Sequence, residues 1–272
     1  LRQPDLARTL RAIAQDGNAG FYDGDVAAAL VSGSSAAGGI WQLKDLAGYR
    51  IVEREPVTVS YRGHRIVTAA LPSSGGVLLA QVLHMLESRP VGALSEAGRV
   101  HMLAEMMRRA YADRAKYLGD SDFVDVPTER LLGRSHAYAH ARSIDPRRAT
   151  PSSALVQQAP AGEDTTHFSI IDREGNRVAA TLSINYPFGS GFVPPGTGVL
   201  LNDEMDDFSA KPGSANAYGL LGNAANAIEP GKRMLSSMSP TFVEHPQHVT
   251  VLGTPGGSRI ISMVLLGILD AI

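Results

Sequence analysis

The chain contains no cysteine among its 272 residues. A disulfide framework, a thiol nucleophile and a thiolate metal site are therefore excluded. No excess of positive charge is present either: 25 lysines and arginines stand against 27 aspartates and glutamates, a net charge of −2 at pH 7. Such a balance creates no general basic field for nucleic acid or an anionic membrane. No apolar run is long enough to span a bilayer. We therefore expect a small-molecule partner.

What is present is the composition of a globular protein. Hydrophobic residues make up 44% of the chain and charged residues 19%, which excludes an intrinsically disordered chain, a collagen and a coiled coil. The length corresponds to one large domain or two small ones.

Both ends of the sequence are expected to be truncated. The first residues show neither an initiator methionine nor an apolar leader. At the other end, the apolar segment 260–272 stops without a glycine or asparagine cap. Any site residue upstream of Leu1 then lies outside this sequence.

Hydrophobic periodicity divides the first 164 residues into helices, a hairpin and a connector. Apolar residues at helical spacing predict helices over 4–15, 24–32, 77–88 and 97–118. β-Branched residues on both sides of Arg62-Gly63 predict a hairpin within 50–71. Residues 120–164 are rich in Pro, Ser, Arg and Ala and are predicted to form an exposed connector.

Strand patterns dominate the second half. Residues 165–171 and 177–185 predict a hairpin, and 241–245 with 248–253 predict a second strand pair that leads into a final helix. Between them, 186–237 is Gly-rich and Asn-rich without periodicity, and so long a loop is usually functional. Together these patterns predict helical layers that cover β-sheets.

Several familiar motifs are missing. The sequence has no G-x-x-x-x-G-K-[ST], no G-x-G-x-x-G and no G-x-S-x-G, which weakens nucleotide-binding and α/β-hydrolase interpretations. His136 and His140 have the i, i+4 spacing of a metal pair, but HExxH is absent and the sequence places no third ligand nearby, so we expect surface histidines and no metal. The acidic run 202–207 lacks the alternation and the glycine of an EF-hand.

Thr165 is the candidate nucleophile. It stands where the exposed connector meets a predicted buried strand. If the chain is cleaved before Thr165, its new α-amino group, with a pKa of about 7.7–8.0, can act as general base for its own hydroxyl. An ordinary strand threonine is the alternative.

Long motifs around Thr165 resemble the γ-glutamyltransferase family. The resemblance covers nearly the whole chain, and its motifs occur in the family's order. They are REPVTVSYRGHRI at 54–66, LPSSGG at 71–76, AYADRAKYLGDSDF at 110–123, then TTHFS, NRVAATLSIN and GVLLNDEMDDFS within 165–209, KRMLSSMSPT at 232–241 and GTPGGSRI at 253–260.

The resemblance implies an α+β fold of the N-terminal-nucleophile hydrolase type, a four-layer αββα sandwich. It also implies a precursor that cleaves itself between Asp164 and Thr165 by an N-to-O acyl shift. Residues 1–164 then form the C-terminal part of the large subunit and 165–272 the N-terminal part of the small subunit, intertwined in one structural domain.

The same resemblance assigns the catalytic groups. Thr165 attacks the γ-carbonyl of a γ-glutamyl compound such as glutathione, and the γ-glutamyl ester passes to water or to an amino acid or dipeptide acceptor. Gly256 and Gly257 match the oxyanion-hole glycines, whose backbone N–H groups can approach a developing negative charge. Ser183 stands where the family commonly has a threonine that hydrogen-bonds the nucleophile.

Substrate-binding residues are implied in the same way. Asn185, Glu204 and Asp207 match residues that hold the substrate ammonium. Ser236 and Ser237 match the serines that bind its α-carboxylate. Tyr218, within 209–223, matches the lid-loop tyrosine of members that cover the pocket and exclude water. The family's α-carboxylate-binding arginine lies upstream of Leu1 and has no counterpart in this sequence.

The resemblance implies no cofactor, no metal and no nucleic acid partner, a heterodimer of the two subunits, and a periplasmic or secreted location. Two other functions stay open. One is a related cephalosporin or glutaryl acylase with the same nucleophile chemistry. The other is an uncleaved, non-catalytic precursor that serves as an interaction module.

Overall fold

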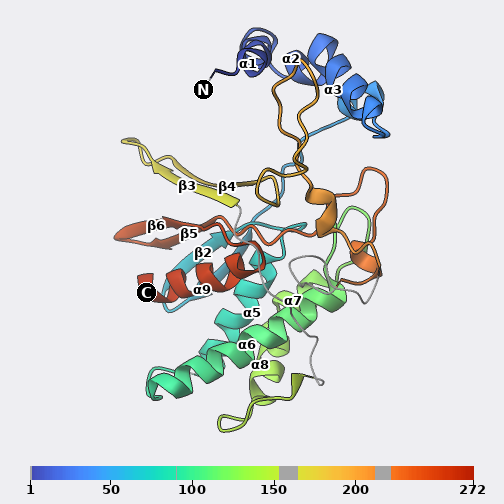
Figure 1. Cartoon of the computed structure of the whole chain (residues 1–272). Helices are drawn as coiled ribbons and strands as arrows, with labels where there is room; N and C mark the ends of the chain where they lie inside the picture. The colour runs from blue at the N-terminus through green and yellow to red at the C-terminus, as the bar shows by residue number, and fades with distance from the viewer. Residues whose placement is uncertain (1, 90, 153–164, 212–221) are drawn as a thin grey trace. The chain divides into compact units, whose positions relative to one another are not determined.

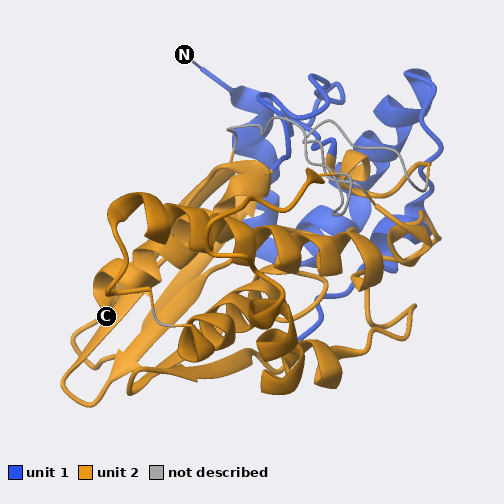
Figure 2. Ribbon diagram, turned by 90° about the horizontal axis from the view of Figure 1, so that it is seen from below, with its two compact units in different colours: residues 1–54, 184–203 blue, residues 55–183, 204–272 orange. Residues whose placement is uncertain are grey.

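The computed structural model describes residues 2–89, 91–152, 165–211 and 222–272. The chain forms two compact units (Figure 2). Unit 1 comprises Leu1–Arg54 and Ile184–Asp203, and unit 2 comprises Glu55–Ser183 and Glu204–Ile272. The unit boundaries fall at other positions than the predicted processing point, so the assignment of 1–164 and 165–272 to two subunits stays a prediction.

Unit 1 is helical. It contains α1 (Pro4–Asp16), α2 (Ala19–Tyr22), α3 (Gly24–Ala36) and α4 (Leu43–Ala47). The helices predicted over 4–15 and 24–32 are confirmed, the second extending four residues further; α2 and α4 are too short for periodicity to reveal. A Cβ at Gly20 would lie 2.1 Å from the carbonyl oxygen of Ala12, so only glycine allows α1 and α2 to approach this closely.

The larger sheet of unit 2 joins the two halves of the sequence. It contains β1 (Val57–Tyr61), β2 (His64–Thr68), β5 (Thr241–His245) and β6 (His248–Leu252), all antiparallel, in the order β1-β2-β5-β6. The predicted hairpin turns at Arg62-Gly63, both with positive φ, 46° and 80°, as a tight two-residue turn requires. β2 and β5 pair from Arg65↔Glu244 to Thr68↔Thr241.

Alternation along these strands decides which face is buried. Val57, Val59, Tyr61, Ile66 and Val243 are at most 9% exposed and all contribute to the hydrophobic core. That face packs against α5 (Gly75–Ser88) and α9 (Ile260–Ala271), with α6 (Glu96–Tyr117) packed on α5 (Figure 1). The strand period of two therefore produces a sheet with one face covered by helices.

The predicted exposed connector 120–164 is wrong over part of its length. The structure forms α7 (Thr128–Leu132) and α8 (Arg134–Arg142) there, and both pack on α5. Leu131, Ala137 and Ala141 are completely buried. The small alanine side chains let α8 approach α5 closely. Because alanine is only weakly hydrophobic, the buried positions of α8 do not stand out as a helical pattern in the sequence. Residues 153–164 lie outside the described residues.

The smaller sheet is the predicted hairpin of β3 (Thr165–Ile171) and β4 (Arg177–Ser183). It lies against the other face of the larger sheet, where Arg177 pairs with Glu244 of β5 at 2.6 Å and both strands contact β6 (Figure 1). The sequence predicts a buried strand here, but Phe168, Ile170 and Leu182 on the outer face are 42–54% exposed, because no described residue of unit 2 covers them.

Helices combined with antiparallel sheets confirm the predicted α+β class. Within unit 2, the described residues form a helical layer, a four-stranded sheet and a two-stranded sheet in that order. The hairpin that begins at Thr165 is thus held on the face of the larger sheet that the helices leave open.

A buried charge cluster fastens the segment after α8 to α6. Glu105, 2% exposed, accepts hydrogen bonds from Arg109 at 2.7 Å and Arg108 at 2.5 Å, and Thr150 Oγ1 donates to it at 2.5 Å. Burial by itself raises the pKa of Glu105, but the hydrogen bonds from Thr150, Arg109 and Arg108 outweigh it and lower the pKa to about 2.

Glu105→Gln is expected to lower the free energy of unfolding by about 3 kcal/mol at pH 7, the equivalent of this pKa shift. A depressed pKa stabilises the fold above the unfolded value of 4.5 and loses that effect as pH falls toward 2. The difference between variant and parent should therefore shrink below pH 4.5 in urea unfolding. Asp5→Asn, in the exposed pair with Arg8, is the control and should change stability by less than about 0.5 kcal/mol. A difference that does not vary with pH would contradict this account.

Candidate active site

Thr165 and Ser183 occupy the open end of the β3–β4 hairpin. They are the first residue of β3 and the last of β4, and the strand register places them opposite each other. The Thr165 hydroxyl donates to Ser183 Oγ at 3.4 Å. Both residues are half-buried. The side chain that contacts the predicted nucleophile is thus Ser183, the residue for which the family resemblance implies this role.

His167 fixes the same face of the hairpin against the larger sheet. Its Nδ1 lies 2.8 Å from Thr181 Oγ1, and its ring fills the space beside Gly253, where an added Cβ would lie 2.2 Å from a ring carbon. Burial lowers the pKa of His167, so the ring is neutral at pH 7. His167 and Gly253 were not predicted as site residues, although both lie inside the motifs shared with the family.

Gly256 and Gly257 form the turn between β6 and α9. Their φ angles are 135° and 54°, a conformation that side chains disfavour, and a short 3₁₀ turn, η4 (Gly257–Arg259), follows. Within the described part of the chain, neither backbone N–H of these two glycines donates a hydrogen bond. The turn therefore presents two adjacent backbone donors.

Tyr111 of α6 holds this turn in place. Its hydroxyl donates to the carbonyl oxygen of Ser258 at 2.5 Å. Burial raises the pKa of Tyr111 to about 12, against the opposing effect of Arg114, so the hydroxyl keeps its proton and stays a donor.

Ser236 and Ser237 lie beside the start of α5. Backbone bonds run from Ser74 N to Ser236 O and from Ser236 N to Pro72 O, each 2.9 Å. Met238 N donates to Ser236 Oγ at 3.0 Å, and the Arg114 guanidinium donates to Ser237 Oγ at 3.4 Å. Because both hydroxyl oxygens accept bonds from the protein, each serine keeps a hydroxyl hydrogen to donate elsewhere.

Arg114 connects these segments, although it was not predicted as a site residue. Only 5% exposed, it donates to Ser74 Oγ at 2.9 Å and to the carbonyl oxygen of Leu235 at 3.4 Å. Burial lowers the pKa of Arg114, while the negative charge of Asp207 acts in the opposite direction. Its position three residues after Tyr111 on α6 was the available signal, since both then lie on one helix face.

Glu204 and Asp207 begin and end a single 3₁₀ turn, η2 (Glu204–Asp207). Asn226, 5% exposed, donates to the carbonyl oxygen of Asp207 at 2.7 Å and accepts from Leu235 N at 3.0 Å. Its own carbonyl oxygen accepts from Ser209 N at 2.8 Å. One buried amide therefore sets the acidic turn at a fixed place relative to the segment that carries Ser236 and Ser237.

The structure does not bring the other predicted site residues, Asn185, Asp164 and Tyr218, together with these side chains of unit 2. Asn185 belongs to unit 1, where it has φ 73°, is 3% exposed and donates to the carbonyl oxygen of Asp203 at 3.2 Å. Asp164 and Tyr218 lie outside the described residues. Within unit 2, the contacts gather Asp207, Ser236, Ser237 and the glycine turn around α6, while Thr165 and Ser183 reach the end of β6 through His167 and Gly253.

A family model described as Gamma-glutamyltranspeptidase matches residues 1–272. The chain belongs to the γ-glutamyltranspeptidase family. It is 49% identical over 267 residues to the glutathione hydrolase proenzyme of Pseudomonas aeruginosa and 44% identical over 278 residues to that of Escherichia coli, matches that cover 96% and 100% of this chain. In each case it spans about half, 48%, of the relative's length.

A solved structure confirms the fold. The cephalosporin acylase of Bacillus halodurans matches 99% of this chain and 47% of its own, with a TM-score of 0.77 and 25% identity. The chain thus has the predicted N-terminal-nucleophile hydrolase fold. Among the described helices, none combines the length and the apolar content that a bilayer crossing requires.

Asn226→Ala is expected to lower the free energy of unfolding by about 1–3 kcal/mol, because it leaves the buried Leu235 N–H and Asp207 carbonyl without their partner. Hydrogen exchange at the Leu235 amide should accelerate at the same time. The control is Asn18→Ala, since Asn18 caps α2 without a side-chain hydrogen bond. Unchanged exchange at Leu235 would show that Asn226 does not hold the two segments together.

Proposed function

We propose that this chain is part of a γ-glutamyl transferase and hydrolase whose nucleophile is Thr165. Two observations support the proposal. The relatives named above are glutathione hydrolase proenzymes, and Thr165 lies opposite Ser183 with a hydroxyl contact of 3.4 Å. The second observation carries the mechanism, because it supplies a polar partner for the attacking oxygen.

Processing begins with Thr165 inside an intact chain. Its Oγ1 attacks the carbonyl carbon of Asp164, and the peptide C–N bond breaks as the nitrogen takes up a proton. The resulting ester is hydrolysed by water, which leaves the Asp164 carboxylate and a free Thr165 α-amine. Residues 1–164 and 165–272 then belong to the large and small subunits of a heterodimer.

In catalysis, the Thr165 amine accepts the hydroxyl proton while Oγ1 attacks the substrate's γ-carbonyl. The backbone N–H groups of Gly256 and Gly257 stabilise the oxyanion of the tetrahedral intermediate. Collapse breaks the amide bond, the amine leaves with the transferred proton, and a γ-glutamyl ester of Thr165 remains. Water or an acceptor amine then attacks that ester and regenerates the hydroxyl.

The substrate's amino-acid head group is held at both of its charged groups. Glu204 and Asp207 accept hydrogen bonds from its ammonium, and Ser236 and Ser237 donate to its carboxylate. Asn185 is a further ammonium ligand that the family resemblance implies. The protein already occupies the acceptor side of both serine hydroxyls, through Met238 N and Arg114, which supports this direction of hydrogen bonding.

Glutathione and related γ-glutamyl compounds are the proposed donors, and water, amino acids or dipeptides the acceptors. No cofactor takes part in this scheme. A periplasmic or secreted location is part of the proposal.

An acylase is the second candidate function, because a cephalosporin acylase shares the fold. The acidic turn of Glu204 and Asp207 argues for a substrate with an ammonium, which a glutaryl amide lacks. An uncleaved interaction module is the third, and the processing test below decides it.

The complete protein is expected to split between Asp164 and Thr165. Intact-mass spectrometry should find two pieces that meet there. Thr165→Ala should stay a single chain. Thr165→Ser keeps a hydroxyl and should therefore still split, at a lower rate than the parent. Thr166→Ala, which alters the neighbouring hydroxyl, is the matched control and should split normally. A folded parent protein that stays uncut would refute the proposed nucleophile.

Asp207→Asn is expected to lower kcat/KM for a chromogenic γ-glutamyl anilide about 10–100-fold, mainly through KM, because a charged hydrogen bond of about 1.5–3 kcal/mol is lost. Asp206→Asn, in the same turn, serves as the control. A glutaryl anilide, without the α-amino group, should be a poor substrate for the parent and should react equally with Asp207→Asn. Preference of the parent for the glutaryl anilide would favour the acylase function.

A further inference from the structure

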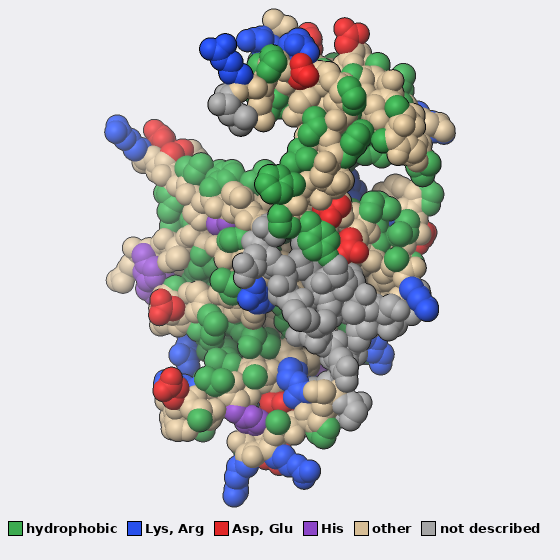
Figure 3. Space-filling view, viewed as in Figure 1, with side chains coloured by type: hydrophobic (Ala, Val, Ile, Leu, Met, Phe, Trp, Pro, Cys, Tyr) green, Lys and Arg blue, Asp and Glu red, His purple; other side chains and the backbone are tan. Residues whose placement is uncertain are grey.

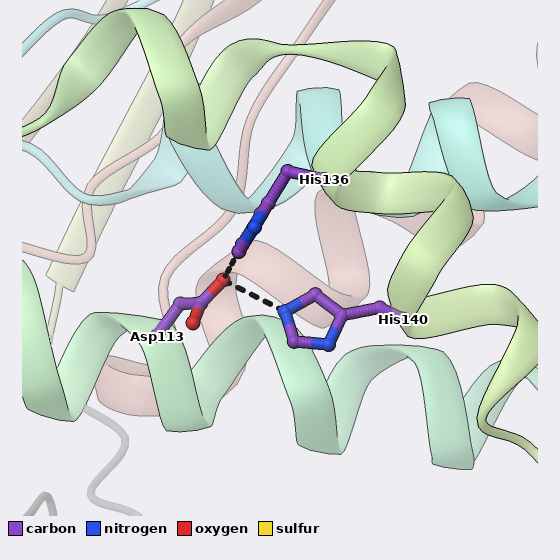
Figure 4. A group of neighbouring side chains, drawn as sticks. All are labelled: Asp113, His136 and His140. Atoms are coloured by element: carbon purple, nitrogen blue, oxygen red, sulfur yellow. Dashed lines mark hydrogen bonds and ion pairs between the residues drawn. The ribbon is translucent and has the colours of Figure 1, made fainter.

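A second cluster of polar side chains lies in unit 2 away from the contacts described above. Asp113 of α6 points toward His136 and His140 of α8 (Figure 4). Its Oδ2 lies 2.6 Å from His136 Nε2 and 3.0 Å from His140 Nε2. The sequence had offered the histidine pair without a third ligand; the packing of α8 near α6 supplies one.

We propose that Asp113, His136 and His140 form a binding site for a divalent transition metal ion, with zinc(II) the best match. Two imidazoles and one carboxylate are a common ligand set for zinc, and histidines four residues apart on one helix face the same ion. In the described part of the chain, Asp113, His136 and His140 form a group of three possible metal ligands. Their ligand atoms all lie within 4.8 Å of one another.

The distances fit a tetrahedral ion after a small adjustment. Zn–N and Zn–O bonds of about 2.0–2.1 Å place neighbouring ligand atoms about 3.3 Å apart. The two Nε2–Oδ2 separations of 2.6 and 3.0 Å need to open by less than 1 Å. In the bound form each ring presents its Nε2 lone pair to the ion and carries its proton on Nδ1.

Burial suits a site that holds an ion but still admits it. The Asp113 side chain is 8% exposed, whereas those of His136 and His140 are 18% and 25% exposed. The carboxylate is thus fixed in the interior, and the two rings lie between it and solvent. An ion can enter from the histidine side without opening the helical layer.

Gln81 of α5 supplies a supporting contact. Completely buried, it donates from Nε2 to Asp113 Oδ2 at 2.8 Å and so orients the carboxylate. Its Oε1 is buried and has no hydrogen-bond partner among the described residues. A water on the open fourth position of the metal is a donor that this oxygen can accept from.

Cobalt(II) and zinc(II) are the probes, because tetrahedral cobalt gives intense visible d–d bands, whereas a six-coordinate ion in water or at an exposed surface site gives only weak ones. The complete protein, freed of any purification tag and of metal, is titrated with cobalt and then competed with zinc. We expect one ion per chain, d–d absorption that zinc abolishes, and a thermal midpoint raised by about 5 °C at 100-fold excess over Kd.

A second group of histidines could also bind cobalt and has to be removed before the titration. His64, His245 and His248 bring their rings within 4.8–5.7 Å of one another at the turns of the larger sheet, where Figure 3 shows histidine side chains at the surface. The titrations therefore use a parent in which all three are replaced by glutamine. His101→Ala, at another histidine of α6, is the matched control and should leave cobalt binding unchanged.

His136→Ala and Asp113→Asn are expected to abolish the d–d bands, and Gln81→Leu to weaken binding about 10–100-fold. Because Asp113 is buried, near-UV circular dichroism checks that its variant folds. His140→Gln, at the most exposed ligand, gives the same test with the least disturbance. Cobalt binding that vanishes in the glutamine background, or that survives both Asp113→Asn and His140→Gln, would overturn the proposal and leave the cluster a hydrogen-bond network.

Discussion

The arrangement of the candidate site depends on one buried guanidinium. The Arg114 side chain extends from α6 into the protein interior, where its charge needs hydrogen-bond partners. Those partners come from segments far apart in sequence: Ser74 at the start of α5, and Leu235 and Ser237 in the loop before β5. A buried cation without these partners is costly, so the loop is held where its oxygen atoms face α6. Tyr111, one turn earlier, fixes the glycine turn after β6 in the same way. One helix face thus positions both the serine pair and the backbone donors.

The loops around α6 have no regular secondary structure, but side-chain hydrogen bonds fix their backbone. Asn226 uses its amide on both sides, toward Asp207 and Leu235, and its carbonyl oxygen toward Ser209. Such a residue replaces the ladder of a regular element with three specific bonds, which fixes a segment that has no periodic structure. The glycines complete the arrangement at the two places where a side chain cannot fit: Gly253 beside the His167 ring, and Gly256 at φ 135°.

Sequence patterns predicted the elements whose periodicity is strong. The hairpins around Arg62-Gly63 and 172–176, the helices at α1, α5 and α6, and the pairing of 241–245 with 248–252 all follow from local alternation and turn residues. α8 was missed because alanines carry its buried face. Arg114 and Asn226 were missed for another reason: their importance lies in hydrogen bonds to residues nine or more positions away, which no local pattern contains. The same limit applied to Asp113, whose histidine partners lie 23 and 27 residues further on.

Asp113 and Arg114 are neighbours in sequence, yet they serve different parts of unit 2. Successive residues on a helix point about 100° apart, so Asp113 faces α8 while Arg114 faces the loop that carries Ser237. An ion bound by Asp113, His136 and His140 would join α6 to α8 through bonds stronger than the hydrogen bonds that now join them, and would restrict rotation of α6 about its axis. A rotation of α6 would displace Arg114 and Tyr111 from their partners. The proposed metal site and the proposed substrate site are therefore mechanically connected through a single peptide unit, although neither shares a ligand with the other.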